Sequence, residues 1–215
     1  MVNTFLIASD FNVSAKLLDN KRLFKQCVEA KQIINILTDI NQTKKGFKSH
    51  PAVKQWTGYT NSLKNYYNCH LKEVLSRGHW KTQMQYYDIN GLIENPWFVS
   101  CSQFLYSHMA SLYRKNPEYY SFLVFPSEYR EHGYMWPSHL ESKSINIEKL
   151  DQYPLSILCH PPQKLKVSGP CTALLKTGKK KGFLCTNRIT VGVFCGIHQR
   201  MISQKIKLIK KKEQL

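Results

Sequence analysis

Four polar residues fall on one strip of a helix that the sequence predicts over residues 17–37. Successive helical residues are turned by about 100°, so the spacings of three, four and three bring Asp19, Arg22, Gln26 and Glu29 into line. The same half of the helix carries the apolar residues Leu23, Cys27, Ala30, Ile33, Ile34 and Leu37. The polar strip therefore points toward the interior or into a cleft, where an unpaired charge is costly. It is either an ion-pair network that braces the core or the polar part of an active site.

Three cysteines and a histidine near the C-terminus have the residue types of a metal site. Cys171, Cys185, Cys195 and His198 follow the pattern C-x13-C-x9-C-x2-H. Zinc binds four such ligands in a tetrahedron, and a short segment with few core residues gains folding energy from the metal. We expect a structural zinc ion here, and the alternative is a tail that contains ordinary reduced cysteines.

A basic loop lies between the first two of these predicted ligands. Lys179, Lys180 and Lys181 belong to this loop, which runs from Lys176 to Gly182. Lysines in such a loop suit phosphate groups, but the loop has no pattern that would read bases. We expect it to add affinity for nucleic acid without sequence preference.

The charge of the chain also indicates a polyanionic partner. The formal net charge is +17 over 215 residues, with a pI near 9.6. Residues 164–215 hold 13 Lys and Arg against one acidic residue, a balance of +12, whereas residues 1–163 hold 18 against 13, a balance of +5. Such a basic chain favours nucleic acid as its partner over an anionic membrane.

Nothing in the sequence predicts export or a membrane span. Asp10 interrupts the first apolar stretch, and no run approaches the ~18 apolar residues of a spanning helix. The seven cysteines are an odd number, which favours reduced thiols. We expect a cytoplasmic or nuclear protein, or one of a viral factory or virion.

Helices are expected to position the polar strip. Ser9 or Asp10 can cap the helical region that leads into residues 17–37, and a second helix is predicted over residues 52–77, from Pro51 to a C-terminal Gly78. A third helix is predicted over residues 97–113. Within this framework His50, Trp56 and Tyr59 are candidates for contacts with DNA, although aromatic residues at helical spacing are more often core.

The expected organisation has four parts. Residues 1–137 form a helical domain, residues 138–170 a connector, residues 171–202 the zinc module and residues 203–215 a basic tail. The fold class is thus mainly α, with a compact helical domain and a small zinc-stabilised C-terminal module. Met1 precedes the small residue Val2, so its removal would leave the α-amine of Val2 as the N-terminus.

Several blocks of the first 137 residues resemble the pyrimidine-dimer DNA glycosylase family. The blocks are NTFLIASDFNVSAKLLDNKRLFKQCVEAKQI, SHPAVKQWTGY, SHMASLYRKNPEYYSFLVFP and YMWP. The resemblance implies a helical domain whose N-terminal α-amine is the nucleophile, with a glutamate beside an arginine on the first long helix. The cysteine-rich end is similar to Cys3His segments appended to varied proteins of large DNA viruses.

The resemblance assigns roles to some residues, and the sequence departs from the family at one important position. Val2 stands at the position of the nucleophilic amine, and Arg22 matches the helix arginine that contacts the DNA backbone. Leu23 stands where the family has its catalytic glutamate. Glu29 and Asp19 are then the candidate carboxylates, and Glu29 is preferred because Arg22 and Gln26 bridge toward it. The residues expected to bind DNA are Arg22, Lys25, Gln26, His50, Trp56, His108, Arg114, Lys179, Lys180 and Lys181.

The leading hypothesis is therefore a DNA repair protein that binds double-stranded DNA and acts as a glycosylase and AP lyase through an imine on its N-terminal amine. The alternative from another class is a non-catalytic protein that uses the same scaffold to bind or condense nucleic acid. Leu23 and the concentration of charge after residue 163 favour the alternative. A module directed at RNA is a third, weaker possibility.

Overall fold

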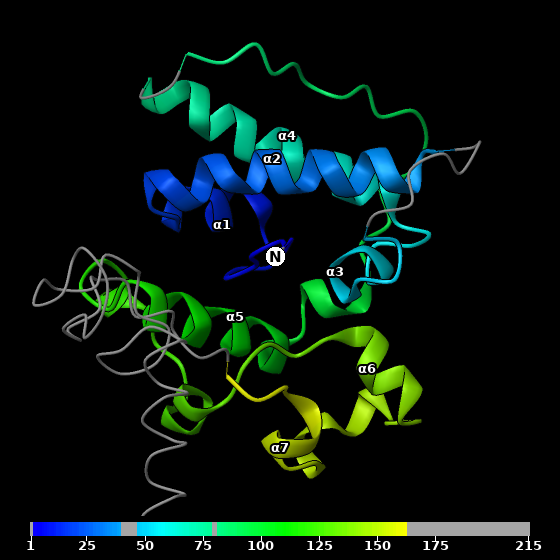
Figure 1. The fold of residues 1–215 in the computed structure, drawn as a ribbon, viewed down its shortest axis with the longest axis vertical. Helices are drawn as coiled ribbons and strands as arrows, with labels where there is room; N and C mark the ends of the chain where they lie inside the picture. Colours follow the sequence, from blue (N-terminus) through cyan, green and yellow to red (C-terminus); the bar gives the residue numbers. More distant parts are fainter. Residues whose placement is uncertain (1, 40–46, 79–80, 163–215) are drawn as a thin grey trace, which may run out of the picture. The chain divides into compact units, whose positions relative to one another are not determined.

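The computed structural model describes residues 2–39, 47–78 and 81–162, and this part of the chain is mainly helical (Figure 1). The helices in chain order are α1 Phe11–Leu17, α2 Asn20–Leu37, α3 Pro51–Lys54, α4 Thr60–Arg77, η1 Trp97–Val99, α5 Ser102–Lys115, η2 Tyr119–Phe122, η3 Ser127–Glu131, α6 Pro137–Ser142, η4 Ile147–Gln152 and α7 Leu155–Leu158. The described residues contain no β-strand, and their one isolated bridge joins Met135 to Cys159. The predicted helical class is thus confirmed for this part.

The predicted helix over residues 17–37 is interrupted at its start. Asp10 caps α1 by accepting hydrogen bonds from the backbone N–H groups of residues 12 and 13. Leu18 and Asp19 are extended, and Asp19 is the N-cap of α2. Arg77 of α4 donates to the carbonyl oxygens of Lys16 and Leu18, at 2.8 and 2.7 Å. These bonds satisfy carbonyl groups that the end of α1 leaves without helical partners.

The other two predicted helices are also divided. Residues 55–59 separate α3 from α4, and Gly58 has a φ of +85°, a left-handed conformation that favours glycine. The third predicted helix becomes the 3-10 turn η1 followed by α5, which ends at Lys115. Gly78 ends α4 in the left-handed conformation, as predicted.

The core forms where α2 packs along α4. The α1 helix also packs against α4, and the apolar residues of the strip side of α2 are almost entirely inaccessible to solvent, except for the half-buried Leu37 near its end. The N-terminal end of the chain lies between α2 and α5 (Figure 1). Its residues 2–7 are all buried, which places the first residues of the chain beside the polar strip.

An extended segment over residues 81–96 is held on the outer face of α4. The contacts join α4 side chains to the segment's backbone: Tyr67 Oη to Gln85 O, Asn68 Nδ2 to Tyr87 O, Tyr87 N to Asn68 Oδ1, Lys64 Nζ to Asp88 O, and Asn61 Nδ2 to Asn90 O and Leu92 O. Most of the hydrogen bonds from α4 are therefore to the backbone of the segment, although the Tyr87 ring also packs against Tyr67 and Ser62 Oγ donates to Asn95 Oδ1.

Residues 138–162 differ from the connector that the sequence predicts. They form α6, η4 and α7, and they bury Leu140, Leu150 and Leu158. The N–H of Gly133 donates to the carbonyl oxygen of His160 at 2.7 Å. A Cβ at position 133 would lie 2.6 Å from the carbonyl oxygen of Pro161, so this close approach requires glycine.

Contacts along the chain separate two units, Met1–Gln163 and Lys164–Leu215. The boundary thus falls after α7 rather than at residue 137. The predicted zinc ligands Cys171, Cys185, Cys195 and His198, the lysines of the basic loop and the basic tail all lie outside the described residues.

Candidate active site

Glu29 holds the backbone of the N-terminal segment. Its Oε2 accepts hydrogen bonds from the backbone N–H of Asn3 at 3.3 Å and from Nε2 of Gln26 at 3.4 Å, and its Oε1 lies 3.2 Å from Nζ of Lys25. The Glu29 side chain is 6% exposed. Burial raises the pKa of this carboxyl above its ordinary value, although Lys25 and the N–H of Asn3 act in the opposite direction.

Gln26 holds the same N-terminal segment two residues further along the chain, at Phe5. Its Oε1 accepts the backbone N–H of Phe5 at 2.7 Å. The hydroxyl of Tyr66 lies 2.8 Å from this Oε1 and 2.8 Å from the Phe5 carbonyl oxygen, and it can donate its one proton to either. The next backbone N–H, that of Leu6, donates to Nδ1 of His108 at 3.1 Å. The N-terminal segment is thus held by polar side chains from α2, α4 and α5.

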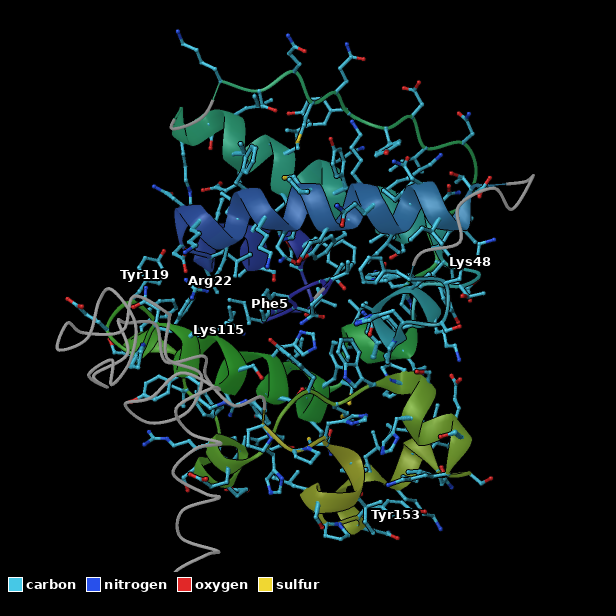
Figure 2. The ribbon with its side chains drawn as sticks, viewed as in Figure 1. Phe5, Arg22, Lys48, Lys115, Tyr119 and Tyr153 are labelled. Carbon is cyan, nitrogen blue, oxygen red and sulfur yellow. The ribbon has the colours of Figure 1, made fainter. Side chains whose placement is uncertain are left out.

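A pocket of about 260 Å³ opens beside Glu29. The residues that line it are Asn3, Phe5, Lys21, Arg22, Lys25, Glu29, Lys115 and Tyr134. Figure 2 shows Phe5, Arg22 and Lys115 in the region between α2 and α5. Four cations and one carboxylate line this pocket, so it suits an anionic ligand that needs a proton acceptor or donor.

The Asn3 side chain adds a polar group at this pocket. The residue is 4% exposed, and neither polar atom of its amide has a hydrogen-bond partner of good geometry among the described residues. The Tyr134 hydroxyl lies near it, and burial raises the pKa of Tyr134 to about 12, so this phenol is protonated at neutral pH. A buried amide without a well-placed partner is unfavourable, and a ligand in the pocket could satisfy it.

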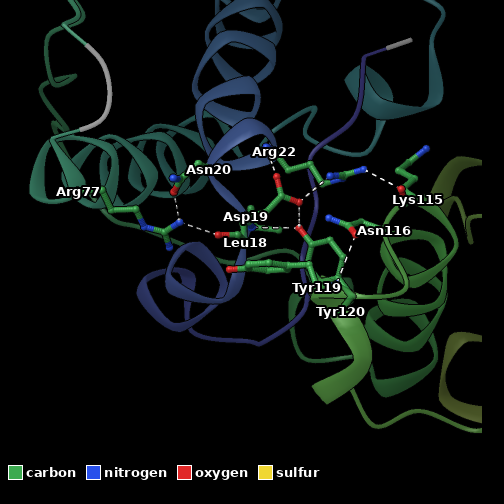
Figure 3. Close-up of polar contacts among 9 residues, drawn as sticks. All are labelled: Leu18, Asp19, Asn20, Arg22, Arg77, Lys115, Asn116, Tyr119 and Tyr120. Carbon is green, nitrogen blue, oxygen red and sulfur yellow. Dashed lines mark hydrogen bonds and ion pairs between the residues drawn. The ribbon is translucent and has the colours of Figure 1, made fainter.

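Asp19 lies at the other end of the strip, in a closed network (Figure 3). Its Oδ1 accepts the backbone N–H of Arg22 at 2.9 Å. Its Oδ2 lies 2.6 Å from Nη1 of Arg22 and accepts the hydroxyl of Tyr120 at 2.7 Å. Burial raises the Asp19 pKa, but the hydrogen bonds from Tyr120 and Arg22 outweigh it and hold the pKa below the ordinary value. Asp19 does not line the pocket.

Arg22 belongs both to the Asp19 network and to the lining of the pocket. Besides its ion pair with Asp19, it donates from Nη2 to the carbonyl oxygen of Lys115 at 3.3 Å, and its guanidinium carbon lies 5.7 Å from the ring centre of Tyr120. It therefore lines the pocket while it fixes the end of α5 against the start of α2.

Comparison with known proteins finds one family that is similar to this region. Residues 2–88 match the pyrimidine dimer DNA glycosylase family. The match spans the N-terminal segment and α1 to α4, so it includes Glu29 and the other α2 residues of the pocket. The resemblance that the sequence predicts is confirmed for these residues. Curated proteins and solved structures give no match.

Two positions to which the resemblance assigns roles lie in the interior. Val2, the expected nucleophile, is 5% exposed, and Leu23, where the resemblance predicts a glutamate, is fully buried in the core. Glu29 lies on the same side of α2 and is bonded to the residue after Val2. A carboxylate is thus present beside the N-terminal segment, although it comes from a different position of the helix.

Several residues expected to bind DNA have structural contacts instead. Trp56 is fully buried and donates its indole N–H to Oγ1 of Thr4 at 2.9 Å. Gln26 and His108 are also fully buried, and burial lowers the pKa of His108 to about 3, so this imidazole is neutral. None of these three side chains has an exposed face for a base or a phosphate.

Two further candidates are engaged near the surface. Arg114 donates to the carbonyl oxygens of Tyr129 and Arg130 at 3.1 and 2.8 Å, which ties α5 to η3. His50 caps α3 by accepting the N–H of Ala52 at 3.1 Å. Lys25, in contrast, lines the pocket with a side chain that is 57% exposed.

Sequence reasoning missed Asn3, Lys21, Lys115, Tyr120 and Tyr134. Of these residues, Lys21 was the easiest to predict from the sequence, since it precedes Arg22 on the helix that carries the strip. Lys115 and Tyr134 follow the match to the glycosylase family and reach the pocket through tertiary structure alone.

The described residues give no metal site and no membrane helix. Within residues 2–39, 47–78 and 81–162, no three His, Cys, Asp or Glu side chains gather where they could share a metal ion. No helix in those ranges combines the length and the apolar character that a membrane crossing requires. The expected zinc site, which lies beyond them, stays a prediction.

Proposed function

We propose that this protein is a DNA glycosylase and AP lyase that works through an imine on the α-amine of Val2 after loss of Met1. The observation that carries the proposal is the hydrogen bond from the backbone N–H of Asn3 to Oε2 of Glu29. It supports a carboxylate one residue from the proposed nucleophile, at the edge of a cationic pocket. The match of residues 2–88 to the family supports the reaction class.

The α-amine suits this reaction because a useful fraction of it is neutral. With a pKa near 8, roughly one-tenth of such an amine is unprotonated at pH 7. The neutral nitrogen attacks C1′ of the damaged nucleotide, the C1′–N bond to the base breaks, and the base leaves with a proton. A proton added to the ring oxygen O4′ then opens the C1′–O4′ bond and gives a protonated imine.

Glu29 would exchange protons with the reacting groups. Its pKa is raised by burial, so it can hold a proton more readily than an exposed glutamate, and its charged form would stabilise the cationic imine. Removal of a proton from C2′ and cleavage of the C3′–O bond would then nick the strand and release the 3′ phosphate. Hydrolysis of the imine returns the free amine.

The cations around the pocket would hold the distorted backbone. Lys21, Arg22 and Lys25 lie within one turn of α2, and Lys115 lies across the pocket on α5. A damaged nucleotide must leave the base stack to reach the pocket, and phosphate contacts stabilise this flipped arrangement.

The test is borohydride trapping with duplexes that contain an abasic site or ultraviolet photoproducts. We expect a covalent adduct, and mass mapping should place it on the peptide that begins at Val2. Intact-mass measurement of the purified protein must first show that Met1 is absent. Absence of an adduct from protein that is correctly processed and binds DNA would refute the proposal.

DNA binding without catalysis is the second candidate function. The specific observations that favour it are the burial of Leu23 at the position of the family glutamate and the 5% exposure of Val2. Under this alternative the protein binds duplex DNA in a salt-dependent manner and gives no trapped adduct. Equal affinity for damaged and undamaged duplexes would support it further.

A further inference from the structure

The pocket contains a second amine with the surroundings of an imine-forming lysine. Lys115 is the last residue of α5 and lines the pocket together with Glu29. Its Nζ makes no hydrogen bond or ion pair with the residues that the structure describes, whereas Nζ of Lys25 lies 3.2 Å from Oε1 of Glu29. Of these two lysines, Lys115 is therefore the one with an amine available to a ligand.

The position of Lys115 is fixed from its backbone. The carbonyl oxygen of Lys115 accepts Nη2 of Arg22, which is itself held by Asp19. Residue 116 then leaves the helix, with its N–H bonded to the carbonyl oxygens of residues 112 and 113. A nucleophilic lysine needs an anchored backbone and an amine without other partners. The amine can then reach the substrate by side-chain rotation while the helix stays in place.

We infer that Lys115 is a second imine-forming amine, which acts on the aldehyde of abasic sites in DNA. The inference rests on the proposed function and deepens it, because it names the substrate class that Lys115 would take. An abasic sugar has already lost its base, so its ring-opened C1′ aldehyde accepts an amine without cleavage of a glycosidic bond. Attack by the Val2 amine is then not required for strand cleavage at an abasic site.

The charges around Lys115 agree with this role. Burial and the nearby cations Arg22, Lys25 and Arg114 lower the pKa of the Lys115 ammonium, while Glu29 acts in the opposite direction. A lower pKa increases the neutral fraction at a given pH, as in other lysines that form Schiff bases. Glu29 lies in the same pocket and would transfer the protons.

The reaction balances with the residues and substrate named. Neutral Nζ adds to the C1′ carbonyl, and the carbinolamine loses water to give a protonated imine. A proton leaves C2′, the C3′–O bond breaks, and the 3′ phosphate departs with the electron pair. Water then hydrolyses the imine, which restores Lys115 and releases the unsaturated aldehyde end of the DNA.

The experiment is borohydride trapping of the full chain on an abasic duplex, with mapping of the cross-linked peptides. We expect an adduct on the peptide that contains Lys115, and we expect Lys115→Arg to reduce that adduct about tenfold or more while duplex affinity changes by less than about threefold, since the charge is kept. Lys72→Arg, on the exposed face of α4, is the matched control and should leave trapping unchanged.

The outcomes separate the inference from the proposed function. An adduct confined to the Val2 peptide and unchanged in Lys115→Arg would overturn the role of Lys115 and leave the proposed function intact. No adduct on either peptide, with abasic or irradiated DNA, would overturn both. Mapping of the wild-type protein decides the matter even if a variant folds poorly.

Discussion

The two carboxylates of the α2 strip occupy opposite kinds of environment. Asp19 accepts hydrogen bonds from the Arg22 backbone, the Arg22 guanidinium and the Tyr120 hydroxyl, and its pKa is lowered. Glu29 lines a pocket, accepts longer hydrogen bonds from the Asn3 N–H and Gln26, pairs with the exposed Lys25 and has a raised pKa. Residue type and helical spacing are similar, but only the surroundings of Glu29 leave room for a ligand.

This difference separates the two interpretations of the strip. An ion-pair network that braces the core describes the Asp19 end, where each polar group is matched by another group of the protein. The Glu29 end has the features of a reactive site, namely a buried carboxylate with raised pKa beside cations and an unmatched amide. The ion-pair interpretation therefore describes the Asp19 end, and the proposed function assigns the active-site interpretation to the Glu29 end.

The largest effect that would test the comparison is on the reaction rate. If the proposed function holds, Glu29→Gln should lower the single-turnover rate of strand cleavage by about 10²–10⁴-fold, because the amide cannot exchange a proton. The isosteric change Asp19→Asn is the matched control on the same helix and should lower the rate less than about fivefold when corrected for folded fraction. Equal losses in both variants would contradict the comparison.

The next effect is on stability and should reverse the order of the two residues. Asp19→Ala removes the N-cap of α2 and leaves Arg22 without its carboxylate, so the free energy of unfolding should fall by about 2–3 kcal/mol. Glu29→Gln should change it by less than about 1 kcal/mol at pH 7. Urea denaturation of the wild type and the two variants measures these free energies. A larger loss in the Glu29 variant would contradict the assignment of the structural role to Asp19.

A smaller loss is expected from the tyrosine that closes the Asp19 network. Tyr120→Phe removes the hydroxyl that donates to Asp19 and accepts the Asp19 N–H, so we expect a loss of about 1–2 kcal/mol. The cleavage rate should not change, since Tyr120 does not line the pocket. Phe98→Leu, in the core away from the strip, would show the cost of altering a buried ring without a hydrogen bond.

The smallest effect is in the pH dependence of stability, and it has opposite signs at the two ends. Glu29 has a raised folded pKa, so its ionised form destabilises the protein at pH 7, and the cost disappears as pH falls through the folded pKa toward 4.5. Glu29→Gln should therefore be favoured relative to wild type more at pH 7 than near pH 4.5.

Asp19 has a lowered folded pKa, so its contribution is present above 3.8 and lost only as pH falls further. The stability difference between Asp19→Asn and wild type should stay constant from pH 7 to pH 5. Denaturation curves at these pH values check both signs. A difference for Asp19→Asn that shrinks well above pH 4 would show that its carboxylate is not held as described.

The sequence predicts the strip but not the division within it. Helical spacing alone places Asp19 and Glu29 on one face. As the N-cap, Asp19 has nearly the angular position that it would have inside the helix, so the spacing cannot show where the helix begins. The extended conformation of Leu18 and Asp19 depends on contacts with α4 and η2, for which residues 17–20 carry little local signal.

Long-range contacts explain most of what the sequence leaves out. Lys115 reaches Arg22 across 93 positions of the chain, and no local pattern marks it as a pocket residue. The sequence predicts a connector over residues 138–170 because this stretch has few regular signals and contains Pro154, Pro161 and Pro162, whereas its short helices are fixed by packing against the core. Gly78, whose effect is local, was predicted correctly.

The segment held on α4 has a consequence for how this protein tolerates change. Asn61, Lys64 and Asn68 bond to backbone groups of residues 87–92, so exchange of one side chain for another in that segment leaves these bonds in place. Insertion or deletion of a single residue would instead shift the carbonyl groups away from their partners on α4. Most positions of the segment should therefore tolerate substitution better than the segment tolerates a change of length; the exceptions are Tyr87, whose ring packs against Tyr67, and Gly91, whose φ is +95°.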